Sequence, residues 1–288
     1  MDVKVAVIGG SGLYDIPGAK RVREISVSTP FGDPSDAITV LEFDGKPVAF
    51  LPRHGRGHRV NPTCVNARAN IFALKTLGVK FIISVSAVGS LKEEIAPRDF
   101  VIPDQIIDRT KSRVNTFFDP YAVHVSFAEP FCHGLADVLE VSGRRLPVTV
   151  HRGGTYVCME GPLFSTKAES AMHRSWGASI IGMTALPEAK LAREAEICYA
   201  TVALVTDYDV WKDDAEVQIS EVLANIKANT DHVKDLIRIA IPQLNMETDC
   251  ACHSALNGAM ITDPALIPAA IRKDWAPLIG KYIPDSRD

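Results

Sequence analysis

Short apolar runs, each bounded by glycine, proline or aspartate, recur along the chain and predict buried strands. They are Val3–Ile8, Thr39–Phe43, Pro47–Leu51, Lys80–Ser86, Asp99–Ile102, Thr155–Met159, Ser179–Thr184 and Tyr199–Thr206. Most of these runs are continuous rather than alternating in polarity, which is typical of strands that are covered on both faces. The pattern therefore predicts a sheet that lies between two layers of helices.

Between the apolar runs lie stretches with the spacing of helices. Residues 62–77 place apolar side chains on one face and stop at Gly78, a common helix terminator. Thr166 and Glu169 form a capping-box pattern that predicts a helix over 166–176. Pro187 stands at a favourable first helical position before residues 188–196.

A long amphipathic pattern runs over residues 219–242 and ends at Pro242. The sequence after it is irregular and predicts short helical pieces. No repeat, low-complexity tract or linker interrupts residues 1–288. We therefore expect an α/β fold in a single domain, in which a central mixed, mainly parallel, twisted sheet lies between helices.

The composition narrows the classes of function. Of the 288 residues, 47% are hydrophobic and 23% are charged, and the formal net charge is −4. Clustered Lys and Arg, which a nucleic-acid or anionic-membrane surface needs, are missing from the sequence. The longest uncharged apolar stretches are far shorter than the roughly 20 residues of a membrane span. We expect a soluble, cytoplasmic protein that binds neither nucleic acid nor membrane.

The six cysteines are expected to be thiols, as is usual in a long chain without a secretory signal. Only Cys250 and Cys252 lie close together in the sequence. His253 would add a third ligand, which is one fewer than a structural zinc site uses. We therefore expect no metal site.

Two polar segments follow early strands and suit an anion. Residues 9–12, which include Ser11, form a glycine-rich loop whose N–H groups can surround an anion, although its spacing matches neither the P-loop nor the dinucleotide fingerprint. Arg53 and His54 follow the strand at 47–51, and a guanidinium beside an imidazole suits bidentate binding of a phosphate oxyanion. Each segment alone is equally compatible with an ordinary turn.

Two further strands end in polar residues. Ser84 and Ser86 lie near the carboxyl end of the run at 80–86, where open α/β sheets bind ligands. Asp207 and Asp209 follow an apolar strand, and burial there would raise the pKa of a carboxyl group toward the range of a general acid. In an extended segment both carboxylates would lie on one face. A cap or a tight turn is the alternative.

Together and in this order, these motifs resemble those of the methylthioadenosine phosphorylases, in the purine nucleoside phosphorylase superfamily. The resemblance runs from about Val5 to Asp209 and continues less closely to Lys281. Its strongest pieces are residues 7–13 (VIGGSGL), 29–37 (TPFGDPSDA), 53–56 (RHGR), 108–110 (DRT), 128–132 (AEPFC), 160–162 (EGP) and 206–209 (TDYD).

The resemblance implies a phosphorolysis with no cofactor other than inorganic phosphate as co-substrate. Phosphate would attack C1′ of 5′-methylthioadenosine and release adenine and 5-methylthioribose 1-phosphate. The phosphate-binding positions of the family fall on Ser11, Arg53, His54, Ser86, Ala87 and Thr184.

The adenine-binding positions of the family fall on Asp207 and Asp209. A protonated Asp207 can donate to N7 and act as the general acid for the departing base, while Asp209 can accept from the 6-amino group. The resemblance also places Met183 under the ribose and Phe164 beside the base. Its positions for the methylthio slot are Ile219 and Val222.

The resemblance also implies an assembly. His124 matches a histidine that the family offers across a subunit boundary, so a homotrimer or a dimer of trimers is expected. Gly182 stands where animal members have Asn. Cys250 and Cys252 resemble a pair that forms a disulfide in heat-stable members, and two further cysteines fall at positions that are paired there. These are Cys132 and Cys198.

Three other functions compete with this interpretation. A hydrolytic nucleosidase on the same scaffold would use water and would not need the anion-binding set. A phosphorylase that is broader, or that acts on 6-oxopurine nucleosides, would use the same chemistry; members that prefer 6-oxopurines generally carry Asn at the position of Asp207. A non-catalytic nucleoside-binding protein would have little need of a protonatable Asp207.

Overall fold

The computed structural model describes residues 3–10, 12–13, 16, 18–43, 45–212 and 217–283. Its strands join in one eleven-stranded sheet, in the order β2-β3-β4-β1-β5-β10-β9-β7 with β11, β6 and β8 branching from β5. The strands are β1 (Val5–Gly9), β2 (Lys20–Ile25), β3 (Ile38–Phe43), β4 (Lys46–Pro52), β5 (Phe81–Ser90), β6 (Phe100–Ile102), β7 (Gln105–Arg109), β8 (Val150–Arg152), β9 (Thr155–Met159), β10 (Ile180–Gly182) and β11 (Cys198–Asp207).

The long strand β5 is the hub of this sheet. It runs parallel to β1 on one side and to β11 on the other. Its last residues, Gly89 and Ser90, pair antiparallel with β10. The sheet is therefore mixed and mainly parallel, which confirms the fold predicted from the sequence.

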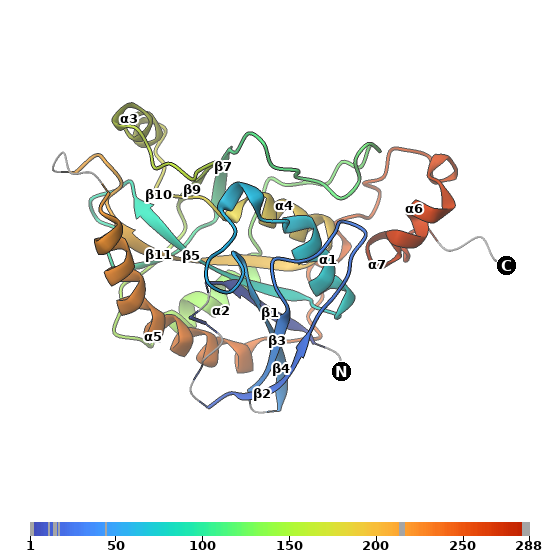
Figure 1. The fold of residues 1–288 in the computed structure, drawn as a ribbon, viewed down its shortest axis with the longest axis horizontal. Coiled ribbons are helices and arrows are strands. Elements are labelled where there is room, and N and C mark those ends of the chain that lie inside the picture. Colours follow the sequence, from blue (N-terminus) through green and yellow to red (C-terminus); the bar gives the residue numbers. More distant parts are fainter. Residues whose placement is uncertain are drawn as a thin grey trace.

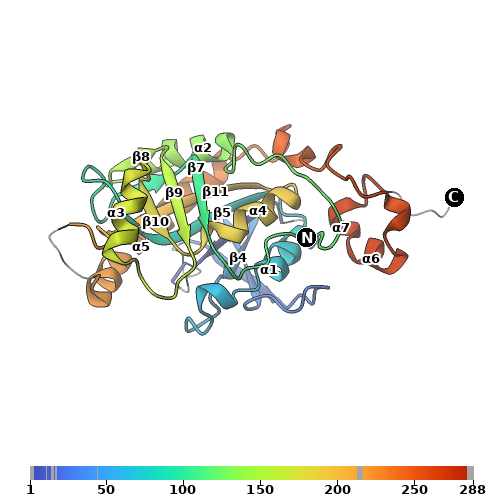
Figure 2. The same cartoon turned by 90° about the horizontal axis from the view of Figure 1, so that it is seen from above.

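Helices cover both faces of the sheet (Figures 1 and 2). Helices α1 (Ala67–Thr76) and α4 (Ala185–Glu194) lie on one face, and α2 (His133–Gly143) and α5 (Ile219–Gln243) lie on the other. Helix α3 (Lys167–Ser175) lies beside β9 and β10 (Figure 2).

Side chains of β1 alternate between the two cores that these helices create. Ala6 and Ile8 pack in the core with α1 and α4, whereas Val5 and Val7 pack in the core with α2 and α5. Both faces of the strand are thus buried, which explains its continuous apolar sequence. Full burial of each large aliphatic side chain contributes about 1.5–3 kcal/mol.

The eight predicted strands are all present, and the structure adds three. Strand β2 is an exposed edge strand of mostly charged residues, and β8 has only three residues, so neither carries an apolar run. Strand β7 is only partly buried. Helix α2 was also not predicted.

The helix predictions hold with corrections at their ends. The stretch at 62–77 is a short 3-10 helix η1 (Pro62–Cys64) followed by α1, because the Asn66 side chain caps a new helix through the N–H of Ala69. Helix α3 carries the predicted capping box. Helix α4 ends at Glu194 rather than at residue 196, and α5 continues one residue past Pro242.

The C-terminal segment consists of short pieces, as predicted. They are η2 (Ala251–Ser254), η3 (Pro264–Leu266), α6 (Ala269–Asp274) and α7 (Ala276–Ile279). Helix α7 packs against α1 (Figure 1), and Glu196 accepts hydrogen bonds from Leu256 and Tyr282 of this segment. In the described part of the chain, no helix combines the length and the apolar character needed to span a membrane.

A close contact between β9 and β10 explains one glycine. Tyr156 of β9 is completely buried, and a Cβ placed on Gly182 of β10 would lie 2.1 Å from its hydroxyl oxygen and 3.0 Å from Cγ1 of Val88. The Tyr156 hydroxyl therefore occupies the space that an asparagine side chain would need at position 182.

We predict that Gly182→Ala lowers the free energy of unfolding by about 1–3 kcal/mol, as overpacking of a core usually does. The loss should be smaller in a Tyr156→Met background, because the flexible thioether can move away from the new methyl group. Chemical denaturation of the four proteins in this cycle measures the coupling.

Gly134→Ala is the matched control, since a Cβ at this helical position would meet no atom within 4 Å. Equal losses for Gly182→Ala in both backgrounds would show that Tyr156 is not the cause.

Candidate active site

The polar residues singled out by the sequence gather where neighbouring strands end or bend. Gly9 at the end of β1 is paired with Pro52 at the end of β4, and the Arg53 N–H donates to the Gly9 carbonyl at 3.0 Å. Ser84 of β5 lies beside Ile8 of β1. The parallel register thus brings the glycine-rich loop, Arg53 and the middle of β5 to one region.

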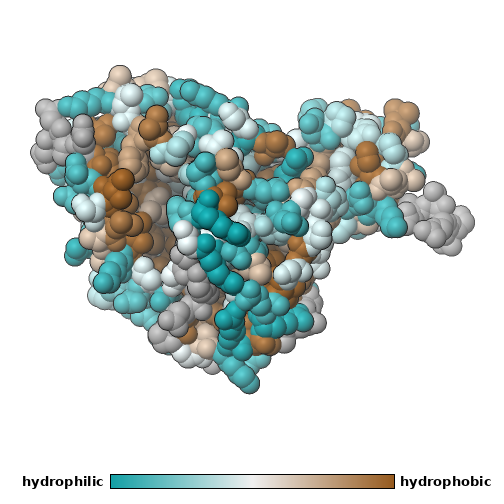
Figure 3. All heavy atoms as spheres, in the orientation of Figure 1, coloured by the Kyte–Doolittle hydropathy of each residue, from teal (hydrophilic) through white to brown (hydrophobic). Residues whose placement is uncertain are grey.

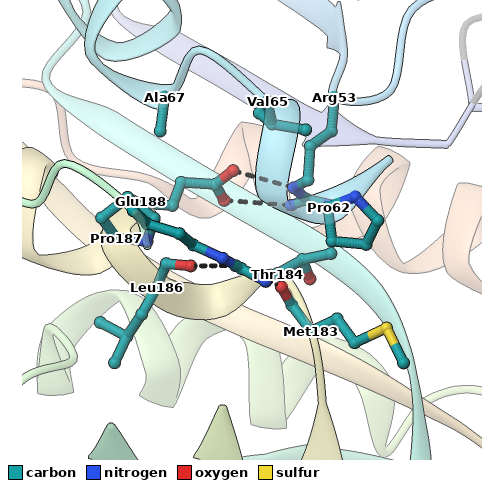
Figure 4. Close-up of a pocket in the computed structure, with 10 residues that line it drawn as sticks. Arg53, Pro62, Val65, Ala67, Met183, Thr184, Leu186, Pro187 and Glu188 are labelled. Atoms are coloured by element: carbon teal, nitrogen blue, oxygen red, sulfur yellow. Dashed lines mark hydrogen bonds and ion pairs between the residues drawn. The ribbon is translucent and has the colours of Figure 1, made fainter. Parts of the chain in front are cut away.

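Arg53 is held by a buried ion pair with Glu188 in the first turn of α4 (Figure 4). Nε and Nη2 donate to the two carboxylate oxygens of Glu188 at 2.8 and 3.0 Å. Nη2 also donates to Ser84 Oγ at 2.7 Å, and Nη1 donates to the Val85 carbonyl at 2.9 Å. Both side chains of the pair are only 3% exposed.

This pairing corrects the role predicted for Arg53. The Nε and Nη2 edge is bonded to Glu188 and is therefore not free for the bidentate phosphate contact that we expected. Among the residues that the structure describes, one hydrogen of Nη1 is left without an acceptor. Burial alone would lower the pKa of Arg53, but the charge of Glu188 raises it, so the guanidinium stays charged.

A narrow cavity of about 10 Å³ lies against this ion pair, lined also by Met183 and Thr184 (Figure 4). It has room for about one water molecule. The cavity is far too small for a nucleoside, so a substrate must bind on the open side of these residues.

His54 follows Arg53 and is held in one tautomer. Its Nδ1 lies 2.8 Å from the carbonyl oxygen of Val60, which can only accept, so Nδ1 carries the proton. Burial and then the charge of Arg53 lower the pKa of His54 to about 4. At neutral pH the ring is therefore uncharged, and its Nε2 offers a lone pair.

Three buried hydroxyl groups near these residues lack hydrogen-bond partners within the described ranges. They belong to Ser86, Tyr156 and Thr184. Burial raises the pKa of Tyr156 to about 12, although the neighbouring hydroxyls of Ser86 and Thr184 act in the opposite direction. The three groups therefore lie together, and all are protonated.

Buried hydroxyls without partners are costly unless a ligand or water satisfies them. Ala87, next to Ser86, is the one exposed residue of the otherwise buried strand β5. An opening therefore reaches the strand at this point. The sequence did not point to Tyr156, because an aromatic residue within a strand is usually part of the core.

Asp207 ends β11 on the same side of the sheet. Burial raises the pKa of its carboxyl group. Thr206 Oγ1 donates to its Oδ2 at 2.7 Å, and the Asp209 N–H donates to its Oδ1 at 2.8 Å. A Cβ on Gly89 of the paired strand would lie 2.9 Å from Asp207 Oδ1, so glycine at that position makes room for the carboxylate.

At 207–209 the structure has a tight turn, which is the alternative that the sequence left open, rather than an extended segment. Asp209 has a φ of 52°, so the chain turns there, and the turn is closed by the bond between Asp209 and Asp207. The two carboxyl groups remain close, and Oδ2 of the buried Asp209 has no partner among the described residues. The pair thus presents one group with a raised pKa and one unsatisfied acceptor.

Helix α5 holds the end of β11 in place. Asn225 Nδ2 donates to the Thr206 carbonyl at 2.7 Å, and Asn229 Nδ2 donates to the Val205 carbonyl at 3.4 Å. Neither residue was predicted from the sequence. Their signal was two asparagines four positions apart on a helix whose other inward positions are apolar.

The other residues predicted to contact the substrate are only partly buried. Met183 is half-buried, and its carbonyl accepts from Arg113 at 2.6 Å. Phe164 and Ile219 are 46% and 65% exposed, and Val222 is half-buried. The two side chains from the first turn of α5 are thus not buried in the core. Figure 3 shows a band of hydrophobic residues on this side of the molecule.

One predicted site residue is not brought to this region, and one cannot be placed. His124 is exposed, and its N–H donates to Ala259 of the C-terminal segment. Ser11 lies outside the described residues.

Comparison with known proteins gives a consistent result. Residues 4–242 match the phosphorylase superfamily. The chain is 54% identical over 286 residues to the S-methyl-5′-thioadenosine phosphorylase of Geobacter sulfurreducens, covering 98% of this chain and 100% of that protein. It is 51% identical over 289 residues to the protein of the same name from Koribacter versatilis, covering 100% and 99% of the two chains.

Solved structures agree with this result. A methylthioadenosine phosphorylase from an antarctic soil metagenomic library has a TM-score of 0.92 and 47% identity over 96% of this chain and 99% of its own. The Schistosoma mansoni methylthioadenosine phosphorylase in complex with adenine has a TM-score of 0.83 and 36% identity, covering 90% of this chain and 99% of its own. The chain therefore belongs to the phosphorylase superfamily, in its S-methyl-5′-thioadenosine phosphorylase family.

Proposed function

We propose that the chain catalyses the phosphorolysis of 5′-methylthioadenosine to adenine and 5-methylthioribose 1-phosphate, a reaction of methionine and purine salvage. The observation that carries the proposal is the set of unpartnered hydroxyls of Ser86, Tyr156 and Thr184 beside an uncharged His54. Such a set fits a tetrahedral oxyanion that accepts several hydrogen bonds.

In this proposal phosphate accepts from Ser86 and Thr184, and a backbone N–H at Ala87 adds to the set. The remaining Nη1 hydrogen of Arg53 and the Ser11 hydroxyl complete it. Nε2 of His54 accepts from a protonated phosphate oxygen. The Tyr156 hydroxyl, which lies beside those of Ser86 and Thr184, lines the same anion site.

The departure of the base is assigned to Asp207. As the C1′–N9 bond breaks, negative charge develops on the purine, and a protonated Asp207 donates to N7 while Asp209 accepts from the 6-amino group. The raised pKa of Asp207 supports this role, because it favours the protonated form. The phosphate, held close to C1′, stabilises the cationic sugar electrostatically.

The rest of the substrate lies along exposed and half-buried hydrophobic side chains. Met183 packs under the ribose, Phe164 beside the base, and Ile219 with Val222 around the methylthio group. The exposure of Phe164 and Ile219 in a single chain supports a site completed by a second subunit, which contributes its own His124. We propose a homotrimer or a dimer of trimers, cytoplasmic, in which residues 1–288 form one domain without a cofactor.

The test of the reaction measures adenine released from 5′-methylthioadenosine with phosphate and after its rigorous removal. We expect adenine only with phosphate, together with 5-methylthioribose 1-phosphate. Equal release without phosphate would identify a hydrolytic nucleosidase and would contradict the anion site. Adenosine and inosine as substrates measure how broad the specificity is.

Replacing Asp207 tests the general acid. We predict that Asp207→Asn lowers kcat by about 10²–10⁴-fold, the usual contribution of such a group. Asp235→Asn, a change of the same kind on the exposed side of α5, is the control and should leave kcat unchanged. Full activity of Asp207→Asn would refute the assignment.

The neutral state of His54 predicts a pH dependence of stability. Because its pKa is about 4 in the folded chain and 6.5 in a free side chain, the unfolded chain binds more protons between these values. Stability contributed by neutral His54 is therefore full above pH 6.5 and is lost as the pH falls toward 4.

Chemical denaturation of the wild type and of His54→Gln at several pH values measures this effect. The difference between their free energies of unfolding should shrink from pH 6.5 to pH 4. A difference that stays constant over this range would show that His54 is not held neutral by the fold.

A further inference from the structure

Four cysteines from distant parts of the sequence meet at the edge of the sheet remote from the proposed catalytic groups. They are Cys132, Cys198, Cys250 and Cys252, and their Sγ atoms all lie within 4.8 Å of one another. Three of the four are buried, and the fourth, Cys250, is half-buried. All are free thiols in the structure.

The four cysteines come from three parts of the structure. Cys132 precedes the first turn of α2, Cys198 begins β11, and Cys250 and Cys252 belong to η2 and the residue before it. The sequence predicts no metal site, because only three candidate ligands lie close together along it. The fold adds Cys132 and Cys198, the two further cysteines that the resemblance singled out.

The spacing of the sulfur atoms matches a tetrahedral metal centre. Tetrahedral zinc with Zn–S bonds of about 2.3 Å holds its sulfur atoms roughly 3.8 Å apart. Cys132 Sγ and Cys250 Sγ are 3.8 Å apart.

A histidine beside the cluster can orient one of its sulfur atoms. His253 Nε2 lies 3.4 Å from Cys198 Sγ, within reach of a hydrogen bond from the ring. Partners of this kind orient the ligands of metal sites and stabilise their charge.

A route from solvent is also present. A cleft of about 660 Å³ beside the cluster is lined by His253 and by charged residues of both signs. It leads from solvent to the histidine that contacts Cys198.

We propose that Cys132, Cys198, Cys250 and Cys252 bind one structural zinc ion. Four thiolates in a tetrahedral arrangement select zinc and leave no open position for a substrate. The cluster lies at the start of β11 and Asp207 lies at its end, about 30 Å away for ten residues of strand. The ion therefore supports the fold and takes no part in the reaction. It connects α2, β11 and the C-terminal segment.

The first test measures metal content. The full chain is purified without a metal-affinity tag and without added metal, and zinc is quantified by elemental mass spectrometry. We expect one zinc ion per chain, and its loss in Cys250→Ser/Cys252→Ser. Cys64→Ser is the matched control, because Cys64 is exposed and outside the cluster, and it should retain the ion.

A second test uses the unchanged wild type, so that it does not depend on the folding of a variant. Zinc is exchanged for Co²⁺, and the absorption spectrum is recorded. We expect thiolate-to-cobalt charge-transfer bands and the intense visible bands of a tetrahedral centre. Removing the metal with a chelator should also lower Tm.

Two results would overturn the proposal. A metal-free chain whose intact mass is lower by four hydrogens would contain two disulfides in place of the zinc site. A metal-free chain in which the four thiols react with a thiol reagent under denaturing conditions, and which shows no tetrahedral cobalt spectrum, would have no metal site. Neither result affects the test of phosphorolysis, which depends on other residues.

Discussion

The buried ion pair between Arg53 and Glu188 is the interaction around which the proposed site is organised. Neither charge could be buried alone, because the desolvation of an unpaired ion costs several kcal/mol. Arg53 also donates to Ser84 and Val85 of β5, and Glu188 accepts from Tyr199 of β11. One pair of charges thereby connects β4, β5, β11 and the beginning of α4. The hydroxyls of Ser86 and Thr184 are carried by two of these same elements.

The same pair sets the electrostatics of the region. Because Glu188 neutralises Arg53 and His54 is held uncharged, the groups beside the hydroxyl cluster contribute little net positive charge. The proposed anion site therefore relies on directed donors rather than on a concentration of positive charge. Such donors are rigid here, since each belongs to a buried strand or to a helix terminus.

The sequence predicted those parts of the fold that depend on the pattern of residues within a short segment. Apolar runs identified the buried strands, and Thr166 with Glu169 identified the start of α3. The edge strand β2 was not predicted, because its charged side chains face solvent on both sides. At Asp209 the sequence left a tight turn and an extended segment as alternatives, since a positive φ at an aspartate leaves no signature in a neighbouring apolar strand.

Contacts between distant residues were beyond any local pattern. Arg53 and Glu188 are 135 positions apart, and Cys132 and Cys250 are 118 positions apart. The resemblance supplied the individual positions Ser86 and Thr184, but not the tyrosine hydroxyl between β9 and β10 that lies beside them. Only the packed structure relates that hydroxyl to Gly182.

The hydrogen bond from His54 Nδ1 to the Val60 carbonyl has a consequence for the choice of anion. It leaves an acceptor, not a donor, at Nε2. An acceptor attracts an oxyanion that still carries a proton and repels one that carries none. Inorganic phosphate keeps a proton at neutral pH, whereas sulfate, which has almost the same size and shape, does not. In the proposed anion site, a single carbonyl oxygen that fixes which nitrogen bears the hydrogen would thus distinguish two tetrahedral anions that geometry alone would not separate.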